Sequence, residues 1–68
     1  MEHPNNRKTR QLDILTNGTR QQVIDWLTWN DHNGVYTDED CINEGLPVLT
    51  LEQAREIMRN QLESEGIL

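Results

Sequence analysis

The amino-acid sequence predicts an all-α protein, a small orthogonal bundle of three to four helices connected by short loops. Two observations carry this prediction. Apolar residues recur at helical spacing in two long segments, 19–34 and 50–66. In addition, four threonines each stand where a hydroxyl can cap the first turn of a helix: Thr9, Thr19, Thr37 and Thr50.

The chain has 68 residues, which is enough for one domain and too few for two. Residues 1–8 are polar, contain Pro4 and lack an apolar anchor, so we expect a mobile N-terminal tail. Residues 9–68 are expected to form a single helical domain. Its first segment, Thr9 to Leu15, fits a short helix capped by Thr9. It fits an extended arm equally well, because apolar and polar residues alternate in it.

The segment from Thr19 to Gly34 is the helix around which we expect the rest of the chain to fold. Thr19 and Gln22 form a capping-box pattern, and Asn33 with Gly34 favours the left-handed backbone that ends helices. On a helical wheel the apolar residues fall in one arc of about 160°. These residues are Val23, Ile24, Trp26 and Leu27. Trp29 lies about 60° beyond the edge of this arc.

A short third helix is expected from Asp38 to about Glu44. Thr37 supplies the cap, and three acids follow in the first turn, where they face the positive end of the helix dipole. Gly45, with a proline soon after it, ends this helix.

The last helix is expected to begin after Thr50, which forms a second capping box with Gln53, and to end at Gly66. Its apolar stripe consists of Leu51, Ala54, Ile57, Met58 and Leu62.

We expect a core assembled from all of these segments. Its predicted members are Leu15, Val23, Trp26, Leu27, Ile42, Leu49, Ile57, Met58 and Leu62. Residues 35–36 and 48–49 are short apolar stretches, and we expect that they can pair as one small β-bridge.

Charge is distributed unevenly along the chain, whose net charge is −6. Residues 1–20 contain four basic and two acidic residues, a net +2, whereas residues 21–68 contain two basic and ten acidic residues, a net −8. An acidic body repels phosphate backbones, so we expect no direct nucleic-acid binding by the folded part. No signal-peptide core and no apolar run of about 18 residues is present, so we expect a cytoplasmic protein without membrane contact.

Residues 29–40 resemble the middle of an EF-hand calcium loop. With Gly34 at the sixth position, oxygen-bearing side chains stand at positions three, five, nine and twelve. They are Asp31, Asn33, Thr37 and Asp40. The first position is Trp29, which cannot ligate a metal, and the twelfth is Asp where the longer Glu is usual. The resemblance covers only this loop and implies, as an alternative function, a degenerate helix-loop-helix that binds a divalent cation.

No other metal site and no cofactor is expected. His32 and Cys41 are the soft ligands outside the tail, and their spacing does not make a four-ligand zinc set even with Asp31 and Asp38 nearby. Catalytic patterns are also absent, because no serine or threonine sits in a glycine-rich elbow and no glycine-rich loop could cradle a phosphate. We therefore expect a non-catalytic protein.

The remaining signal is a group of acidic and aromatic residues in the middle of the chain. Aromatic side chains beside a charged rim are typical of binding patches. We predict that the following residues contact a partner: Trp29, Asp31, Tyr36, Asp38, Glu39 and Asp40. The opposing interpretation is that Trp29 completes a small core and that the acids form a solvated face.

From this group we expect a small acidic protein-protein interaction module that binds a larger protein with a basic surface. Chains of this size and charge suit regulators or inhibitors, including those of phages and other mobile elements. A second alternative is a nucleic-acid mimic, whose acidic body occupies the nucleic-acid groove of another protein. A homodimer is compatible with these functions, because a chain this short buries only about 60% of its unfolded surface.

Overall fold

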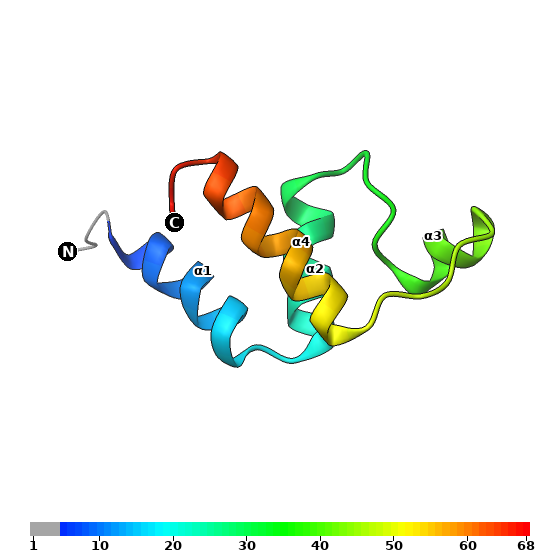
Figure 1. Cartoon of the computed structure of the whole chain (residues 1–68), viewed down its shortest axis with the longest axis horizontal. Helices are drawn as coiled ribbons and strands as arrows, with labels where there is room; N and C mark the ends of the chain where they lie inside the picture. Colours follow the sequence, from blue (N-terminus) through cyan, green and yellow to red (C-terminus); the bar gives the residue numbers. More distant parts are fainter. Residues whose placement is uncertain (1–4) are drawn as a thin grey trace.

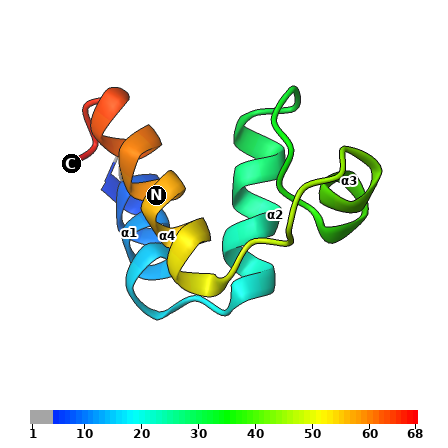
Figure 2. The same ribbon diagram turned by 45° about the vertical axis from the view of Figure 1, so that its right-hand side comes forward.

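The computed structural model describes residues 5–68, and in this range the chain is all-α, as predicted. Its helices are α1 (Asn5–Asn17), α2 (Arg20–Asn30), α3 (Asp38–Asn43) and α4 (Leu51–Ser64). α1, α2 and α4 pack against one another, and the main contact is between α2 and α4. α3 packs against none of the other helices and projects at one end of the molecule (Figure 1). In the turned view α2 lies between the α1 and α4 pair on one side and α3 on the other (Figure 2).

The threonine caps form as the sequence predicts in three of four places. The Thr19 hydroxyl accepts from the Gln22 amide at 3.2 Å, and the Gln22 side chain accepts from the Thr19 amide at 2.8 Å. The same reciprocal pair forms between Thr50 and Gln53, at 3.1 and 3.0 Å. The Thr37 hydroxyl accepts from the third residue of its helix at 3.1 Å. Each cap satisfies backbone donors that the first helical turn leaves without partners.

The N-terminal segment differs from the prediction. α1 begins at Asn5, so residues 5–8 of the expected tail are helical, and residues 1–4 lie outside the described part of the chain. Thr9 lies inside α1 and does not start it, and the alternative of an extended arm is wrong. The helix ends where Gly18 donates its backbone N–H to the carbonyl of Ile14 at 2.9 Å. A Cβ at Gly18 would overlap that carbonyl, which explains why the tight turn uses glycine.

The core lies between α2 and α4, with Tyr36 from the loop that follows α2. Its buried members are Val23, Ile24, Trp26, Leu27, Tyr36, Ala54, Met58 and Leu62. Leu15, Leu49 and Ile57 were predicted to be core residues and are only half-buried at its edge. Ile42 was also predicted to be buried, and this is wrong: its side chain is 68% exposed, because α3 has no helix to pack against. The expected β-bridge is also wrong, because residues 5–68 contain no strand or bridge.

The molecule is elongated, with α1 toward one end of its long axis and α3 at the other (Figure 1). The radius of gyration is 12.6 Å and the longest extent is 44 Å. A compact domain of this length has a radius of gyration of about 11 Å. Among residues 5–68, no helix combines the length and the apolar composition that crossing a lipid bilayer requires.

Replacing a core leucine and an exposed isoleucine tests this division into a packed body and a projecting helix. Leu27→Ala should lower the free energy of unfolding by about 2–5 kcal/mol, because it leaves a cavity in a fully buried site. Ile42→Ala should change it by less than about 0.5 kcal/mol. Chemical denaturation followed by circular dichroism measures both, and a large loss with Ile42→Ala would show that α3 is part of the core.

Candidate functional site

Tyr36 was predicted to contact a partner, and in the structure this residue is only 8% exposed. Its hydroxyl donates to the Asp31 carboxylate at 2.8 Å and accepts from the Gln61 side-chain amide at 2.9 Å. The ring lies over Gly34, where a Cβ would overlap it. Tyr36 therefore fastens the loop after α2 to α4 and offers little surface to a partner.

The same polar network holds the end of α2 against the end of α4. The Asn30 side-chain amide donates to Gln61 and to Glu65, each at 2.9 Å. Asp31 also accepts from the Asn33 backbone N–H at 3.2 Å. The carboxylate of Asp31 thus has two partners inside the protein, and its role here is to hold the loop.

This arrangement gives no support to a cation site in the loop. Its first acidic residue, Asp31, is bound to Tyr36, and the Thr37 hydroxyl accepts from the Asp40 backbone in a helix cap. Across residues 5–68, no three histidine, cysteine or acidic side chains come close enough together to hold a metal ion.

A segment that projects from the body contains the predicted acids. We call residues 38–48 the α3 arm; it comprises α3 and the connector that returns toward α4. Arg20 ties both ends of this arm to α2. Its guanidinium donates to the Asp38 carboxylate at the start of the arm and, at 2.7 Å, to the carbonyl of Leu49 just after its end. Asp38 is therefore paired within the protein.

The α3 arm has a closed side and an open side. Cys41 is 1% exposed, so this residue faces the protein interior. The large aliphatic side chains of the arm are open to solvent: Ile42 is 68% exposed, Leu46 52% and Val48 45%. All four of its acids are exposed as well: Asp38, which is paired with Arg20, and Glu39, Asp40 and Glu44. The aliphatic residues of the arm were not predicted from the sequence as an exposed surface. The shortness of the helix could have predicted this exposure, because six residues with one isoleucine cannot bury that side chain without a partner element.

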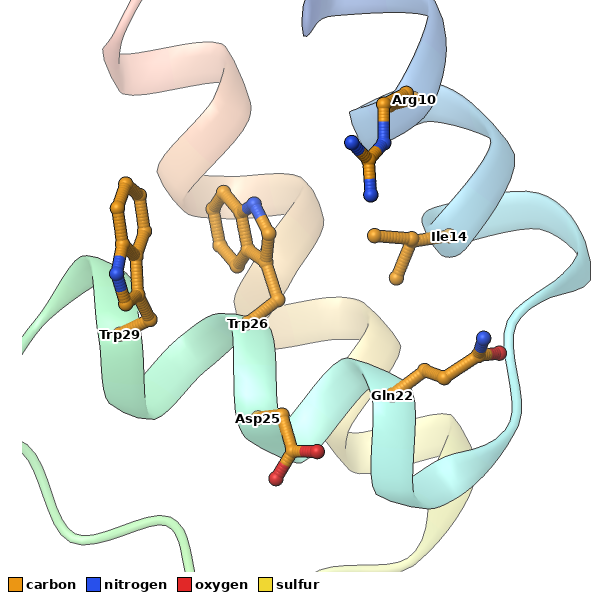
Figure 3. Close-up of a pocket in the computed structure, with 6 residues that line it drawn as sticks. All are labelled: Arg10, Ile14, Gln22, Asp25, Trp26 and Trp29. Atoms are coloured by element: carbon orange, nitrogen blue, oxygen red, sulfur yellow. The ribbon is translucent and has the colours of Figure 1, made fainter.

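Trp29 is exposed as predicted, at 69%, but it lies on another side of the molecule. It lines an open groove between α1 and α2 with a cavity volume of about 400 Å³. The other lining residues are Arg10, Ile14, Gln22, Asp25 and Trp26. The two indoles stand side by side, and Arg10 approaches them from α1 (Figure 3).

The structure does not bring the predicted partner-binding residues together. Trp29 and Arg20 are nine positions apart on α2, which at about 100° per residue places them on opposite sides of the helix. The α3 arm is attached on the Arg20 side. Of the predicted set, Asp38, Glu39 and Asp40 are exposed on the arm and Trp29 is exposed in the groove. Asp31, Tyr36 and Asp38 are engaged in internal contacts.

Comparison with known proteins adds no relative: no family model, no curated protein and no solved structure matches this chain. The candidate surfaces therefore stand on the geometry alone.

Tyr36→Phe tests the polar network. Removing the hydroxyl leaves Asp31 and Gln61 without a shared partner, and the free energy of unfolding should fall by about 1–2 kcal/mol. The fold should persist, because the ring still fills its place in the core. Thermal unfolding followed by circular dichroism measures the loss. An unchanged stability would show that the network contributes nothing.

The same residue makes stability depend on alkaline pH. Burial, and next the hydrogen bond to Asp31, raise the pKa of Tyr36 above its ordinary value. The unfolded chain therefore loses the phenol proton at about pH 10 while the folded chain still holds it. Stability from this group is complete below about pH 10 and is lost as pH rises toward the folded pKa. Because Tyr36 is the only tyrosine, the ultraviolet absorbance of phenolate reports its titration directly. The Tyr36→Phe variant should show a weaker alkaline loss of stability.

Arg20→Gln should loosen the α3 arm. The variant removes the contact with Asp38, and a shorter amide cannot reach both Asp38 and the Leu49 carbonyl. We expect backbone amides of α3, such as that of Cys41, to exchange with solvent at least about tenfold faster, because local opening becomes easier. Arg59→Gln is the matched control, since Arg59 makes only an exposed contact of 4.0 Å with Glu56. Equal exchange in the two variants contradicts the role of Arg20.

Proposed function

We propose that this protein is a non-catalytic protein-protein interaction module that contacts its partner through the α3 arm. One observation carries the proposal. The arm packs against no other helix and still exposes three large aliphatic side chains, those of Ile42, Leu46 and Val48. Exposing aliphatic side chains to water is unfavourable in free energy, and burying them against a partner removes this unfavourable term.

The chemistry of the arm defines the surface that fits it. Exposed aliphatic side chains call for an apolar recess. The acids beside them, Glu39, Asp40 and Glu44, favour a recess with a basic rim, because opposite charges steer association and exclude acidic partners. The proposal therefore keeps the basic partner surface expected from the sequence and replaces Trp29 and Tyr36 with arm residues as the apolar contacts.

Tethering makes the arm suited to recognition. Arg20 limits the positions that the arm can take, so less conformational freedom is lost on binding than a free loop of this length would lose. The proposal includes the cytoplasmic location and the role of regulator or inhibitor that size and charge suggested.

Affinity capture from source cells with matched variants tests the proposal. The double variant Ile42→Ser with Leu46→Ser should recover at least about tenfold less partner, because it removes buried apolar contact at the interface. Leu68→Ser is the control: Leu68 is 51% exposed and lies outside the arm. If the double variant and the control recover the same proteins in the same amounts, the arm is not the binding surface.

A nucleic-acid mimic is the second candidate, and the exposure of Glu39, Asp40 and Glu44 favours it. The two candidates differ in which variant matters. A mimic loses its partner when the three acids are neutralised and when salt is raised, and it tolerates serine at positions 42 and 46. Binding that depends on the aliphatic residues and survives moderate salt supports the interaction module.

A further inference from the structure

The chain contains two Asn-Gly pairs, Asn17-Gly18 and Asn33-Gly34. An asparagine followed by glycine is the arrangement in which a side-chain amide converts most readily to an acid. Glycine has no Cβ to hinder the approach of its backbone nitrogen to the preceding side chain. The two pairs are equivalent in the sequence, whereas the fold gives them different surroundings.

The conversion consumes water and requires no enzyme. The backbone nitrogen of the glycine loses its proton to solvent and attacks the side-chain carbonyl carbon of the asparagine. A new C–N bond forms, the bond from that carbon to the side-chain nitrogen breaks, and this nitrogen takes up a proton and leaves as ammonia. Water then opens the resulting cyclic imide at either of its carbonyls, which yields aspartate or isoaspartate. The side-chain amide must therefore be free to rotate, and the glycine nitrogen must be released from its hydrogen bond.

Asn17-Gly18 is held in an unreactive arrangement at the end of α1. The Asn17 side-chain amide donates to the Asp13 carboxylate at 3.0 Å, and the Gly18 N–H donates to the Ile14 carbonyl at 2.9 Å. Gly18 is also buried. Both reacting groups are engaged with α1, so the reaction requires the last turn of this helix to open.

Asn33-Gly34 lies in the loop between α2 and α3, where the surroundings are more open. Asn33 is exposed and Gly34 is half-buried. Within residues 5–68, Asn33 forms its hydrogen bond through its backbone N–H, which donates to the Asp31 carboxylate at 3.2 Å, so the side-chain amide can rotate. The Gly34 N–H donates to the Asp31 backbone carbonyl at 3.2 Å, in a turn outside any helix. Releasing this nitrogen requires only the turn to open.

Tyr36 determines how readily this turn opens. Its ring lies over Gly34, where a Cβ would overlap it. Its hydroxyl donates to the Asp31 carboxylate, and Asp31 is the residue that accepts from both Asn33 and Gly34 in the turn. The hydroxyl also accepts from Gln61 on α4, so the turn is connected to the packed body through one phenol group.

We propose that Asn33 is a site of spontaneous deamidation in the folded protein, that Asn17 is protected, and that Tyr36 controls the rate at Asn33. Either product adds one negative charge beside Asp31, and isoaspartate also adds one carbon to the backbone between residues 33 and 34. Like charges repel, so the hydrogen bonds of Asp31 with the Asn33 N–H and the Tyr36 hydroxyl become weaker. The modification therefore loosens the loop that leads to the α3 arm, whether or not the arm binds a partner.

Peptide mapping of the full chain, after incubation in warm and mildly alkaline buffer, tests the proposal. Trypsin separates the two sites, because cleavage after Arg10, Arg20 and Arg55 places Asn17 in peptide 11–20 and Asn33 in peptide 21–55. Mass spectrometry detects the exchange of an amide for an acid, and fragmentation assigns it to a residue. Asn33 should deamidate at least about tenfold faster than Asn17, because the turn opens more often than the helix end. Equal rates, or a faster rate at Asn17, overturn the inference.

The same incubation in concentrated urea separates the effect of the fold from that of the sequence. Unfolding removes the hydrogen bonds of both pairs, so Asn17 and Asn33 should then deamidate at similar rates. A difference that is as large in urea as in native buffer shows that the fold does not protect Asn17, and the inference fails.

Two variants test the chemistry and the role of Tyr36. Asn33→Gln should abolish modification at this position, because the longer side chain would have to close a larger ring. Tyr36→Phe should deamidate at Asn33 at least about threefold faster than the wild-type protein, with an unchanged rate at Asn17, because the turn opens more often without the hydroxyl. Circular dichroism confirms that both variants are folded. An unchanged rate at Asn33, or equal acceleration at both sites, contradicts control by Tyr36.

The modified chain can be tested directly. Ion-exchange chromatography separates it from the starting protein, because it carries one more negative charge. Its thermal midpoint should be lower than that of the unmodified chain. Asn33→Asp carries the charge without the additional backbone carbon and should show part of this shift. A modified chain with an unchanged midpoint contradicts the weakening of the contacts of Asp31.

Discussion

Arg20 fixes the position of α3, the helix that packs against no other helix. Between the end of α2 and the start of α4, the chain runs through a loop, the short α3 and a connector, and α3 packs against no other helix. A six-residue helix is not stable in water by itself. The Arg20 guanidinium donates to Asp38, the first residue of α3, and to the Leu49 carbonyl. One side chain of α2 therefore holds the segment at both its start and its end. The position of the exposed aliphatic residues depends on this contact.

The polar network around the Tyr36 hydroxyl is the second set of contacts that holds the loop after α2 in place. It joins Asp31 at the end of α2 to Gln61 on α4, and Gln61 in turn accepts from Asn30. Each side chain of this network satisfies a group that would otherwise lose its hydrogen-bond partner near the core. Together with Arg20 it explains how a chain with a small core keeps a loop and an arm of this length in defined positions. The apolar packing of α2 on α4 supplies the rest.

Local signals predicted the starts of α2, α3 and α4. The end of α2 was predicted less well: the helix stops at Asn30, before the expected stop at Asn33 and Gly34, and Gly34 does not adopt the left-handed backbone. Capping boxes at Thr19 and Thr50, the cap at Thr37 and the apolar stripe of α4 act within a few residues, so they can be read from the sequence. The start of α1 was missed because residues 5–8 contain no apolar residue and so show no helical periodicity. Ile42 was misplaced because an apolar residue in a short helix was assumed to have a partner. The burial of Tyr36 was not predicted, because its contacts with α4 and with Gly34 form only in the tertiary structure.

The candidate site shows the same limit. The acids of the arm and the exposure of Trp29 could be anticipated, but their placement on opposite sides of α2 could not. By itself the sequence determined the helix class, the caps, the acidic body and the lack of a catalytic motif, because these follow from neighbours within one or two turns. The tertiary structure alone decided that α3 projects, that Tyr36 is enclosed and that the groove and the arm face away from each other. Those outcomes depend on contacts between residues far apart in the chain, which local spacing does not encode.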